Sequence, residues 1–416
     1  MNNLLKNFRP ATISCARNTW KSQVLPPRAT EVCSPITQLS EEELAFQDTV
    51  RKFSLNTIKP LVREMDENNK MDKSVLNGLF ENGFFGISIP AEYDGLELEF
   101  FKEALMVEEL SKVDPSVAIT ISVHNTLVLP LIIKYGSEEQ KRKYLTRCHK
   151  DWIGSFCLTE PSSGSDAFAL KTTAKADGGD YIINGSKMWI TNAQYAEFFV
   201  VMANCDPSKG YRGITCFIVD KDQAGVSVGK NEDKLGIRAS STCAVHFDNV
   251  RVPKSSILGE LGKGYKYSID CLNSGRVVIA AQMNGLASGC LDATIPYLQE
   301  RKQFNTRLID FQGIQFDVAT IASEIEISRT MTINACRLYE QGHSIIKEAS
   351  MAKLFASKMA TNATSKCVEM MGGVGFSKEF PVEKLYRDCK IGTIYEGSSN
   401  IQMSTIAKII DADYTH

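Results

Sequence analysis

The sequence predicts a multidomain α+β protein with an N-terminal α-helical domain, a central antiparallel β-barrel domain and a C-terminal four-helix bundle. Its 416 residues are two to three times the usual length of one domain. Apolar residues recur with helical spacing up to about residue 150 and again from residue 264, whereas short runs of β-branched and aromatic residues fill the interval. We therefore expect domains over 36–150, 151–262 and 263–416.

Charge and hydropathy exclude two classes of protein. The 47 Lys and Arg residues nearly balance 49 Asp and Glu residues, so no basic field indicates a nucleic-acid partner. The longest apolar stretch, 117–133, is interrupted by His124, Asn125 and Pro130, and we expect no membrane span.

The cysteines and histidines indicate a reducing compartment and no metal site. The 12 cysteines are scattered without a C-x-x-C pair, which is typical of small buried hydrophobic side chains rather than a disulfide framework. None of the five histidines has a Cys, His or Glu at metal-ligand spacing, so we expect no bound metal.

Residues 1–35 are interpreted as a mitochondrial transit peptide. The segment contains five basic residues and no acidic one before Glu31, and it lacks the apolar core of a secretory signal. A disordered basic arm is the alternative interpretation.

The first helix is predicted to begin at Ser40 and to end at Pro60. Ser40 and Glu43 have the spacing of a capping box, and Leu39 and Leu44 can form the hydrophobic staple around it. Proline interrupts a helical hydrogen-bond pattern, which places the stop. Further helices are expected over 73–82, 100–112, 116–135 and 137–146.

The central region is predicted to consist of short strands separated by turn residues such as Asn184-Gly185. No helix-length pattern lies between the strands, which favours an antiparallel barrel or sandwich over a βαβ array. The expected strands cover 152–158, 170–176, 181–183, 188–191, 198–203, 213–219, 225–229 and 242–247.

The third region returns to helical spacing. Long helices are expected over 265–301, 310–341 and 345–371, with a shorter one over 400–410. Helices of this length joined by short loops pack most simply as an antiparallel bundle.

Four short motifs could form a ligand site, and each also has an ordinary structural interpretation. The Ser- and Thr-rich loop 158–166 can bind phosphate or carbonyl oxygens, or can be a simple turn. Trp189 can be a core residue, and the glycines at 372–375 can be a helix C-cap. Those glycines do not complete a dinucleotide-binding fingerprint. Glu396, beside Gly397, can be a solvated surface charge.

Together and in this order, the motifs resemble the acyl-CoA dehydrogenase family. The resemblance covers about 39–412 and rests on the stretches GSFCLTE, NGSKMWI, KLGIRASSTC, MAKLFAS and KIGTIYEGSSNIQ. It implies a mitochondrial matrix flavoenzyme that oxidises short- or branched-chain acyl-CoA thioesters to trans-2-enoyl-CoA, as in branched-chain amino acid breakdown. It further implies electron-transfer flavoprotein as electron acceptor, and a homo-oligomer, expected to be a homotetramer.

The resemblance also implies which residues bind FAD. The loop 156–165 and the stretch 189–191 would contact the flavin, while the remaining residues would hold the other parts of FAD, Arg301 and Gln312 doing so across a subunit interface. The predicted contacts are Phe156, Cys157, Leu158, Thr159, Glu160, Pro161, Ser162, Ser163, Gly164, Ser165, Trp189, Ile190, Thr191, Arg301, Gln312, Glu369, Met370, Met371, Gly372, Gly373, Ser398, Ser399 and Asn400.

Glu396 matches the family's catalytic base. Removing a weakly acidic α-proton requires a carboxylate in a desolvated site, together with hydrogen bonds that polarise the thioester carbonyl. In the family these donors are the backbone N–H of the base and a ribityl hydroxyl of FAD. The predicted CoA or acyl contacts are Ser165, Tyr211, Tyr265, Asn273, Ser274, Gly275 and Arg276.

The chain departs from the family pattern where Ser162 and Ser163 replace Gly or Ala, and where Asn305 replaces Gly. The serines add hydrogen-bond donors, and Asn is the residue that best tolerates a left-handed backbone after Gly. Two other functions remain open at this point: an acyl-CoA oxidase, and a non-catalytic acyl-CoA or protein-binding scaffold with the same fold.

Overall fold

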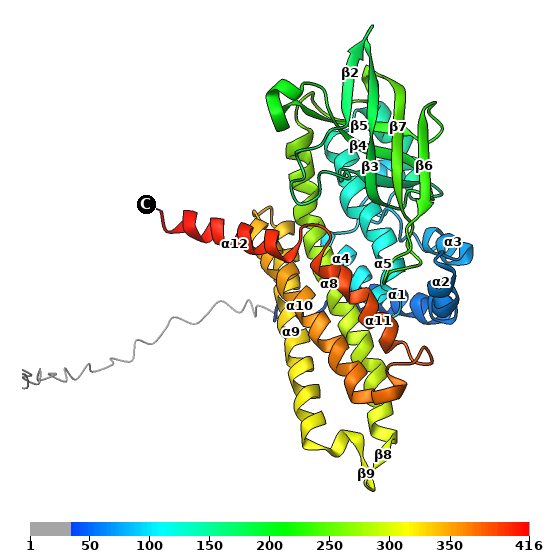
Figure 1. The fold of residues 1–416 in the computed structure, drawn as a ribbon, viewed down its shortest axis with the longest axis vertical. Helices are drawn as coiled ribbons and strands as arrows, with labels where there is room; N and C mark the ends of the chain where they lie inside the picture. The colour runs from blue at the N-terminus through cyan, green and yellow to red at the C-terminus, as the bar shows by residue number, and fades with distance from the viewer. Residues whose placement is uncertain (1–34, 416) are drawn as a thin grey trace, which may run out of the picture. The chain divides into compact units, whose positions relative to one another are not determined.

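The computed structural model of the protein describes residues 35–415 (Figure 1). The predicted transit peptide therefore lies, except for Pro35, outside the described residues.

The N-terminal helices begin where the capping box predicts. Helix α1 (Glu41–Phe53) follows Ser40, whose Oγ accepts a hydrogen bond from Glu43 N at 3.2 Å while Ser40 N donates to Glu43 Oε2 at 2.8 Å. The predicted stop at Pro60 is wrong. The chain stays helical through η1 (Ser54–Ile58) and η2 (Lys59–Leu61) into α2 (Val62–Asn68), because Pro60 lies at the start of a new turn, where its missing N–H costs nothing.

The other predicted helices of this region are present, as α3 (Lys73–Glu81), α4 (Phe100–Ser111) and α7 (Glu138–Cys148), with the short turn η3 (Ala91–Tyr93) between the first two. The predicted helix 116–135 is a continuous run of α5 (Pro115–Ser122), the π-helical turn η4 (Val123–Val128) and α6 (Leu129–Tyr135). By length and apolarity this run could span a membrane, but 89% of its apolar window is buried within the protein. It is accounted for as a core helix.

The central region is a seven-stranded sheet with the order β1-β4-β2-β3-β7-β6 and β5 paired to β4. Its strands are β1 (Ile153–Cys157), β2 (Thr173–Asp177), β3 (Asp180–Thr191), β4 (Ala196–Asn204), β5 (Ile214–Asp220), β6 (Val226–Asn231) and β7 (Thr242–Pro253). The runs 181–183 and 188–191 belong to one long strand, interrupted by irregular pairing with β7.

The prediction of an antiparallel β-barrel is wrong in two respects. The sheet is an open half-barrel, and β4 pairs in parallel with both β1 and β2. Helices cover the outer face of β4, where Val128 and Leu145 share one buried cluster with Phe198. The next residue, Phe199, lies on the opposite face and packs with Phe247 of β7 inside the half-barrel. Alternating hydrophobicity reports that a face is buried but does not report what covers it.

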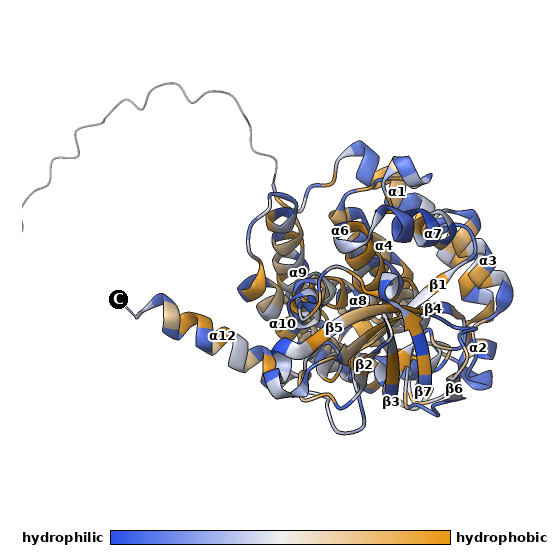
Figure 2. Ribbon diagram, turned by 90° about the horizontal axis from the view of Figure 1, so that it is seen from above, coloured by the Kyte–Doolittle hydropathy of each residue, from blue (hydrophilic) through white to orange (hydrophobic). Residues whose placement is uncertain are grey.

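The C-terminal region is helical, as predicted. Its helices are α8 (Gly264–Glu300), α9 (Gln312–Glu340), α10 (Ile346–Met371), α11 (Val382–Cys389) and α12 (Ser399–Asp413). A small hairpin of β8 (Lys302–Gln303) and β9 (Thr306–Arg307) joins α8 to α9. In Figures 1 and 2, α8, α9 and α10 lie side by side while α12 extends away from them. Apolar residues gather where the sheet meets α4 and α8 (Figure 2).

A buried ionic cluster joins the three regions. Lys384 of α11 lies 2.9 Å from Asp114 Oδ1, at the start of α5, and 2.6 Å from Asp388 Oδ2. Asp388 Oδ1 accepts a hydrogen bond from the backbone N–H of Ile237, in the loop between β6 and β7. The segment from α11 to α12, which contains Glu396, is thereby anchored at its beginning.

The ten cysteines within residues 35–415 are free thiols, and all but Cys205 are buried. No group of three or more His, Cys, Asp or Glu side chains suited to a metal ion occurs in this described part of the chain.

Candidate active site

Glu396 lies in a left-handed turn between η9 (Lys390–Thr393) and α12. Its φ is 49°, and Gly397 follows with a φ of 93°. The residue is half-buried overall, but both carboxylate oxygens are enclosed and have no hydrogen-bond partner within residues 35–415. A buried, unpartnered carboxylate on a strained backbone is the signature of a functional residue rather than of a surface charge.

The middle of α8 forms one wall beside this carboxylate. A Cβ atom at Gly275 would lie 2.3 Å from Glu396 Oε2 and 3.1 Å from Leu127 Cδ2. Only glycine allows α8 to approach the carboxylate so closely. Arg276 Nε donates to the carbonyl oxygen of Glu396 at 3.4 Å, and its Nη1 contacts Asn273 Oδ1 at 2.8 Å. The structure therefore brings Glu396, Asn273, Gly275 and Arg276 together, as the sequence predicts.

Burial raises the pKa of Glu396 to about 7, and the positive charges of Lys353 and Arg276 act in the opposite direction. A carboxylate with this pKa is a stronger base than an exposed one and is still substantially ionised at neutral pH.

The predicted flavin-binding segments lie next to each other. Met188 N donates to Thr159 O at 2.8 Å, which ties the loop 156–165 to β3. Trp189 has a φ of 60° at the irregularity in this strand, and its side chain is 54% exposed. A bulky residue with positive φ marks local strain, so this aromatic surface is held outward by the surrounding structure. Thr191, two residues on, is half-buried.

Several side chains of these segments face the protein interior. Glu160 is buried, forms an ion pair with Lys187 at 2.8 Å and accepts backbone hydrogen bonds from Lys171 and Thr172. Ile190, Cys157 and Phe156 belong to apolar clusters. Ser162, Gly164 and Ser165 are exposed, whereas Ser163 is buried and donates to Asp166 O at 2.7 Å. The exposed surface of the loop is therefore formed by Pro161, Ser162, Gly164 and Ser165, while the buried Glu160 fixes the loop to the protein interior.

Two predicted substrate contacts lie next to each other at the N-terminal end of α8. The rings of Tyr211 and Tyr265 pack edge-on at 4.9 Å, and Phe168 lies against Tyr265 at 6.4 Å. Ser274 is buried and its Oγ donates to Cys271 O, which leaves its side chain occupied within the helix.

The remaining predicted FAD contacts lie elsewhere in the chain. Arg301 and Gln312 flank the β8–β9 hairpin, which lies at the opposite end of α8 from the sheet (Figure 1). Glu369, Gly372 and Gly373, at the end of α10, are exposed, whereas Met370 and Met371 are buried in the core. Ser398, Ser399 and Asn400 begin α12, directly after the Glu396 turn. Asn305 has a φ of 59°, the left-handed conformation that its replacement of glycine predicts.

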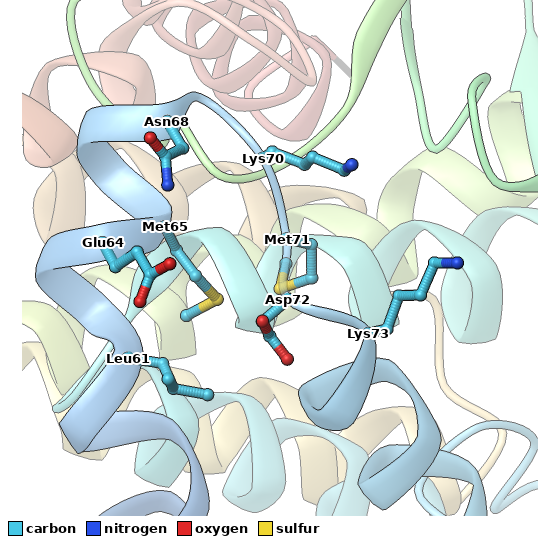
Figure 3. A pocket seen from close by; sticks show the side chains of 8 residues that line it. All are labelled: Leu61, Glu64, Met65, Asn68, Lys70, Met71, Asp72 and Lys73. Carbon is cyan, nitrogen blue, oxygen red and sulfur yellow. The ribbon is translucent and has the colours of Figure 1, made fainter.

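A pocket of about 330 Å³ lies between α2 and α3 and is unrelated to this site (Figure 3). Met65 and Met71 turn toward its interior, while Lys70 and Lys73 extend away from it. All of its lining residues fall within 61–73, so it contains none of the predicted site residues.

Three residues around the site were not predicted from the sequence: Lys353, Gln402 and Lys187. Lys353 Nζ donates to Gly397 O at 2.7 Å, and Gln402 Nε2 contacts the same oxygen at 2.9 Å. Lys187 Nζ donates to Leu158 O at 3.1 Å. A lysine within an apolar helical stretch, such as MAKLFAS, was the available signal, because lysine is seldom buried without a specific partner.

Comparison with known proteins agrees with this geometry. Models of the N-terminal, middle and C-terminal domains of acyl-CoA dehydrogenases match residues 40–150, 155–250 and 262–410. The short/branched chain specific acyl-CoA dehydrogenase of rat mitochondria is 56% identical over 381 residues, 92% of this chain and 88% of the relative. The bovine protein of the same name is 55% identical over the same shares. Butyryl-CoA dehydrogenase from Megasphaera elsdenii has a similar structure, with a TM-score of 0.88, 35% identity, and coverage of 90% of this chain and 99% of that chain.

The chain belongs to the acyl-CoA dehydrogenase family. Members of this family are FAD-dependent oxidoreductases.

The residues present are suited to FAD. The exposed indole of Trp189 offers an aromatic surface beside a loop that exposes two serines, a glycine and a proline, which fits a planar ring that carries a polar chain. The unpartnered Glu396 carboxylate supplies the one group that the proton transfer requires.

Proposed function

We propose that the protein oxidises short- or branched-chain acyl-CoA thioesters to trans-2-enoyl-CoA, with Glu396 as the catalytic base. The unpartnered, enclosed carboxylate of Glu396 is the observation that carries this proposal. The names of the related rat and bovine enzymes support the substrate class.

The reaction removes a proton and a hydride from adjacent carbons of the substrate. Glu396 takes the α-proton. Bound FAD would supply the acceptor for the hydride that leaves the β-carbon. Within residues 35–415 the backbone N–H of Glu396 has no hydrogen-bond partner, so it is free to donate to the thioester carbonyl oxygen. That donor stabilises the negative charge that develops as the proton leaves.

The proposed FAD contacts are the loop 156–165, Trp189 to Thr191 and Ser398 to Asn400 near the base, with Arg301, Gln312 and Glu369 to Gly373 at the far end of the bundle. Because these two groups lie at opposite ends of α8, we assign the second group to FAD bound to a partner subunit. This assignment requires a homo-oligomer, proposed to be a homotetramer. In it α12, which extends from its own chain, would pack against other subunits and complete the predicted four-helix bundle (Figure 1).

The acyl-CoA contacts are proposed to be Ser165, Tyr211, Tyr265 and Asn273 to Arg276. Because Tyr211 and Tyr265 pack together there, we place the binding site of the CoA moiety at the N-terminal end of α8. The proposed electron acceptor is electron-transfer flavoprotein, and the proposed compartment is the mitochondrial matrix, in keeping with the mitochondrial relatives. The domain boundaries 36–150, 151–262 and 263–416 also remain proposals, supported by the ranges of the three domain matches.

The substitution Glu396→Gln tests the assignment of the base. It preserves the shape of the side chain but removes the proton acceptor, so FAD should stay bound while bleaching of the flavin by isobutyryl-CoA, 2-methylbutyryl-CoA or butyryl-CoA is abolished. Normal bleaching in this variant would refute the role of Glu396. Rapid reoxidation of the substrate-reduced enzyme by oxygen would identify an oxidase, and a colourless protein that stays inactive with added FAD would indicate a scaffold.

A further inference from the structure

The backbone around Glu396 is held in an uncommon conformation. Both Glu396 and Gly397 have positive φ, at 49° and 93°. A residue with a side chain seldom adopts this conformation, and it persists only where the surroundings impose it. Interactions that impose it here should therefore aim the Glu396 carboxylate.

Three side chains from three helices bind the two carbonyl groups of this turn. Lys353 of α10 and Gln402 of α12 donate to Gly397 O, at 2.7 Å and 2.9 Å. Gln402 and Arg276 of α8 also reach Glu396 O, at 3.2 Å and 3.4 Å. Lys353 and Gln402 are fully buried.

Gln402 fits closely into the space that Gly397 leaves. A Cβ atom at Gly397 would lie 2.5 Å from Gln402 Nε2, so the absence of a side chain is what allows the amide to reach both carbonyl oxygens. The two residues form a matched pair, in which glycine adopts the left-handed conformation and glutamine binds the carbonyls that this conformation turns inward.

Lys353 adds a charge as well as a hydrogen bond. The ionisable groups facing the Glu396 carboxylate are Cys271 and Arg276 from α8, Lys353 from α10 and Tyr395 from its own turn. Burial raises the pKa of both Cys271 and Tyr395, so these two groups are uncharged. Lys353 and Arg276 are thus the cations that offset the buried negative charge.

We infer that Lys353 and Gln402 are positioning residues that hold the left-handed Glu396–Gly397 turn, and that Lys353 also keeps the carboxylate of the base ionised. This inference rests on the proposed role of Glu396. It assigns different consequences to the two residues: both aim the base, but only Lys353 alters its charge state.

The test compares Lys353→Met, Lys353→Arg and Gln402→Leu in the FAD-loaded enzyme, using single-turnover flavin bleaching by 2-methylbutyryl-CoA as a function of pH. Lys353→Met should slow bleaching on the order of 100-fold, because an aimed group that moves by about 1 Å loses rate on that scale. Its acid limb should also move up by about one pH unit, since losing a nearby cation raises the pKa of a carboxylate.

The other two variants separate aiming from charge. Gln402→Leu should slow bleaching roughly ten- to a hundredfold with the acid limb unmoved, because it removes hydrogen bonds without removing charge. Lys353→Arg should keep the acid limb of the unsubstituted enzyme and recover part of the rate. The exposed Lys358, on the same helix, supplies a control: Lys358→Met should change the rate less than about twofold.

Normal rates and an unmoved acid limb in Lys353→Met and Gln402→Leu would overturn the inference. If Lys353→Met does not fold, the other two variants decide the question. A normal bleaching rate in Gln402→Leu together with a displaced acid limb in Lys353→Arg would overturn the inference. The variant Glu396→Gln distinguishes failure of this inference from failure of the proposed function. Bleaching by that variant refutes the base itself, whereas its inactivity beside fully active Lys353 and Gln402 variants refutes only their positioning role.

Discussion

Lys384 on α11 and Lys353 on α10 are both fully buried, yet their surroundings differ completely. Lys384 contacts two carboxylates, Asp114 and Asp388, and their charges raise its pKa well above the ordinary value despite burial. Lys353 donates to a carbonyl oxygen, burial lowers its pKa to about 8, and Glu396 is the anion that acts on it through space.

The difference separates structural polar groups from functional ones. In the cluster around Lys384, as in the Lys187–Glu160 pair, each carboxylate has an oxygen at hydrogen-bonding distance from the lysine. Around Lys353, both oxygens of Glu396 are left without a partner among the described residues. A buried carboxylate without a partner destabilises the fold. It is tolerated where the carboxylate must accept a proton during the reaction.

The largest expected effect concerns the Lys384 cluster, whose disruption should change the stability of the fold. Replacing Lys384 with Met leaves Asp114 and Asp388 buried without a cation, which should lower the free energy of unfolding by about 3–5 kcal/mol. Urea denaturation of the FAD-loaded enzyme, followed by circular dichroism, would measure the change against Lys358→Met. An unchanged denaturation midpoint would mean that the cluster does not stabilise the fold.

The next effect concerns the approach of α8 to the base. The Cβ added by Gly275→Ala would overlap Glu396 Oε2, so the carboxylate must move and the bleaching rate should fall on the order of 100-fold, about 2.7 kcal/mol of barrier. Gly313→Ala is the matched control, because a Cβ atom there meets no atom of residues 35–415 within 4 Å. Equal rates in the two variants would show that Glu396 is not confined at this wall.

The pH dependence should follow the ionisation of Glu396. A base acts only when deprotonated, and burial places its pKa at about 7. Therefore kcat/KM should be nearly constant well above pH 7 and should fall about tenfold per pH unit below it. Steady-state rates measured from roughly pH 5 to pH 9 would test this pH dependence of kcat/KM. A profile that stays flat down to the ordinary pKa of a glutamate would show that the site is better hydrated than the enclosed carboxylate indicates.

The smallest expected effect comes from a paired charge at the surface. Arg51 and Asp48 lie 2.5 Å apart on α1, but both are exposed to solvent, which screens their attraction. Arg51→Ala should leave the denaturation midpoint unchanged within error. A loss comparable to that of Lys384→Met would contradict the distinction between buried and exposed pairs.

Local elements were the most predictable part of this protein. Ser40 and Glu43 form the predicted capping box, and Asn305 adopts the left-handed backbone expected where it replaces glycine. Both depend on residues a few positions apart, so their physics is contained in the sequence. Pro60 was misjudged because a proline that ends one helical turn can equally begin the next.

The site was predictable where a stretch of sequence resembles a motif of the family. Glu396, Gly275 and Arg276 were identified from motifs, and the structure brings them together. Glu160 was predicted to contact FAD, but its carboxylate is bound by Lys187 behind the loop. Lys353 and Gln402 escaped notice, because a lysine and a glutamine in separate helices carry no sign that they bind the same carbonyl group.

The sequence by itself determined the order of helical and β regions and the approximate place of most long elements, because these depend on periodicity and on local hydrogen bonds. It also determined the family, because the motifs resemble those of the family. Only the tertiary structure decided that helices cover the sheet and leave it open, and that three helices converge on the Glu396 turn. Such contacts join residues hundreds of positions apart, and which distant partners meet depends on how whole elements pack.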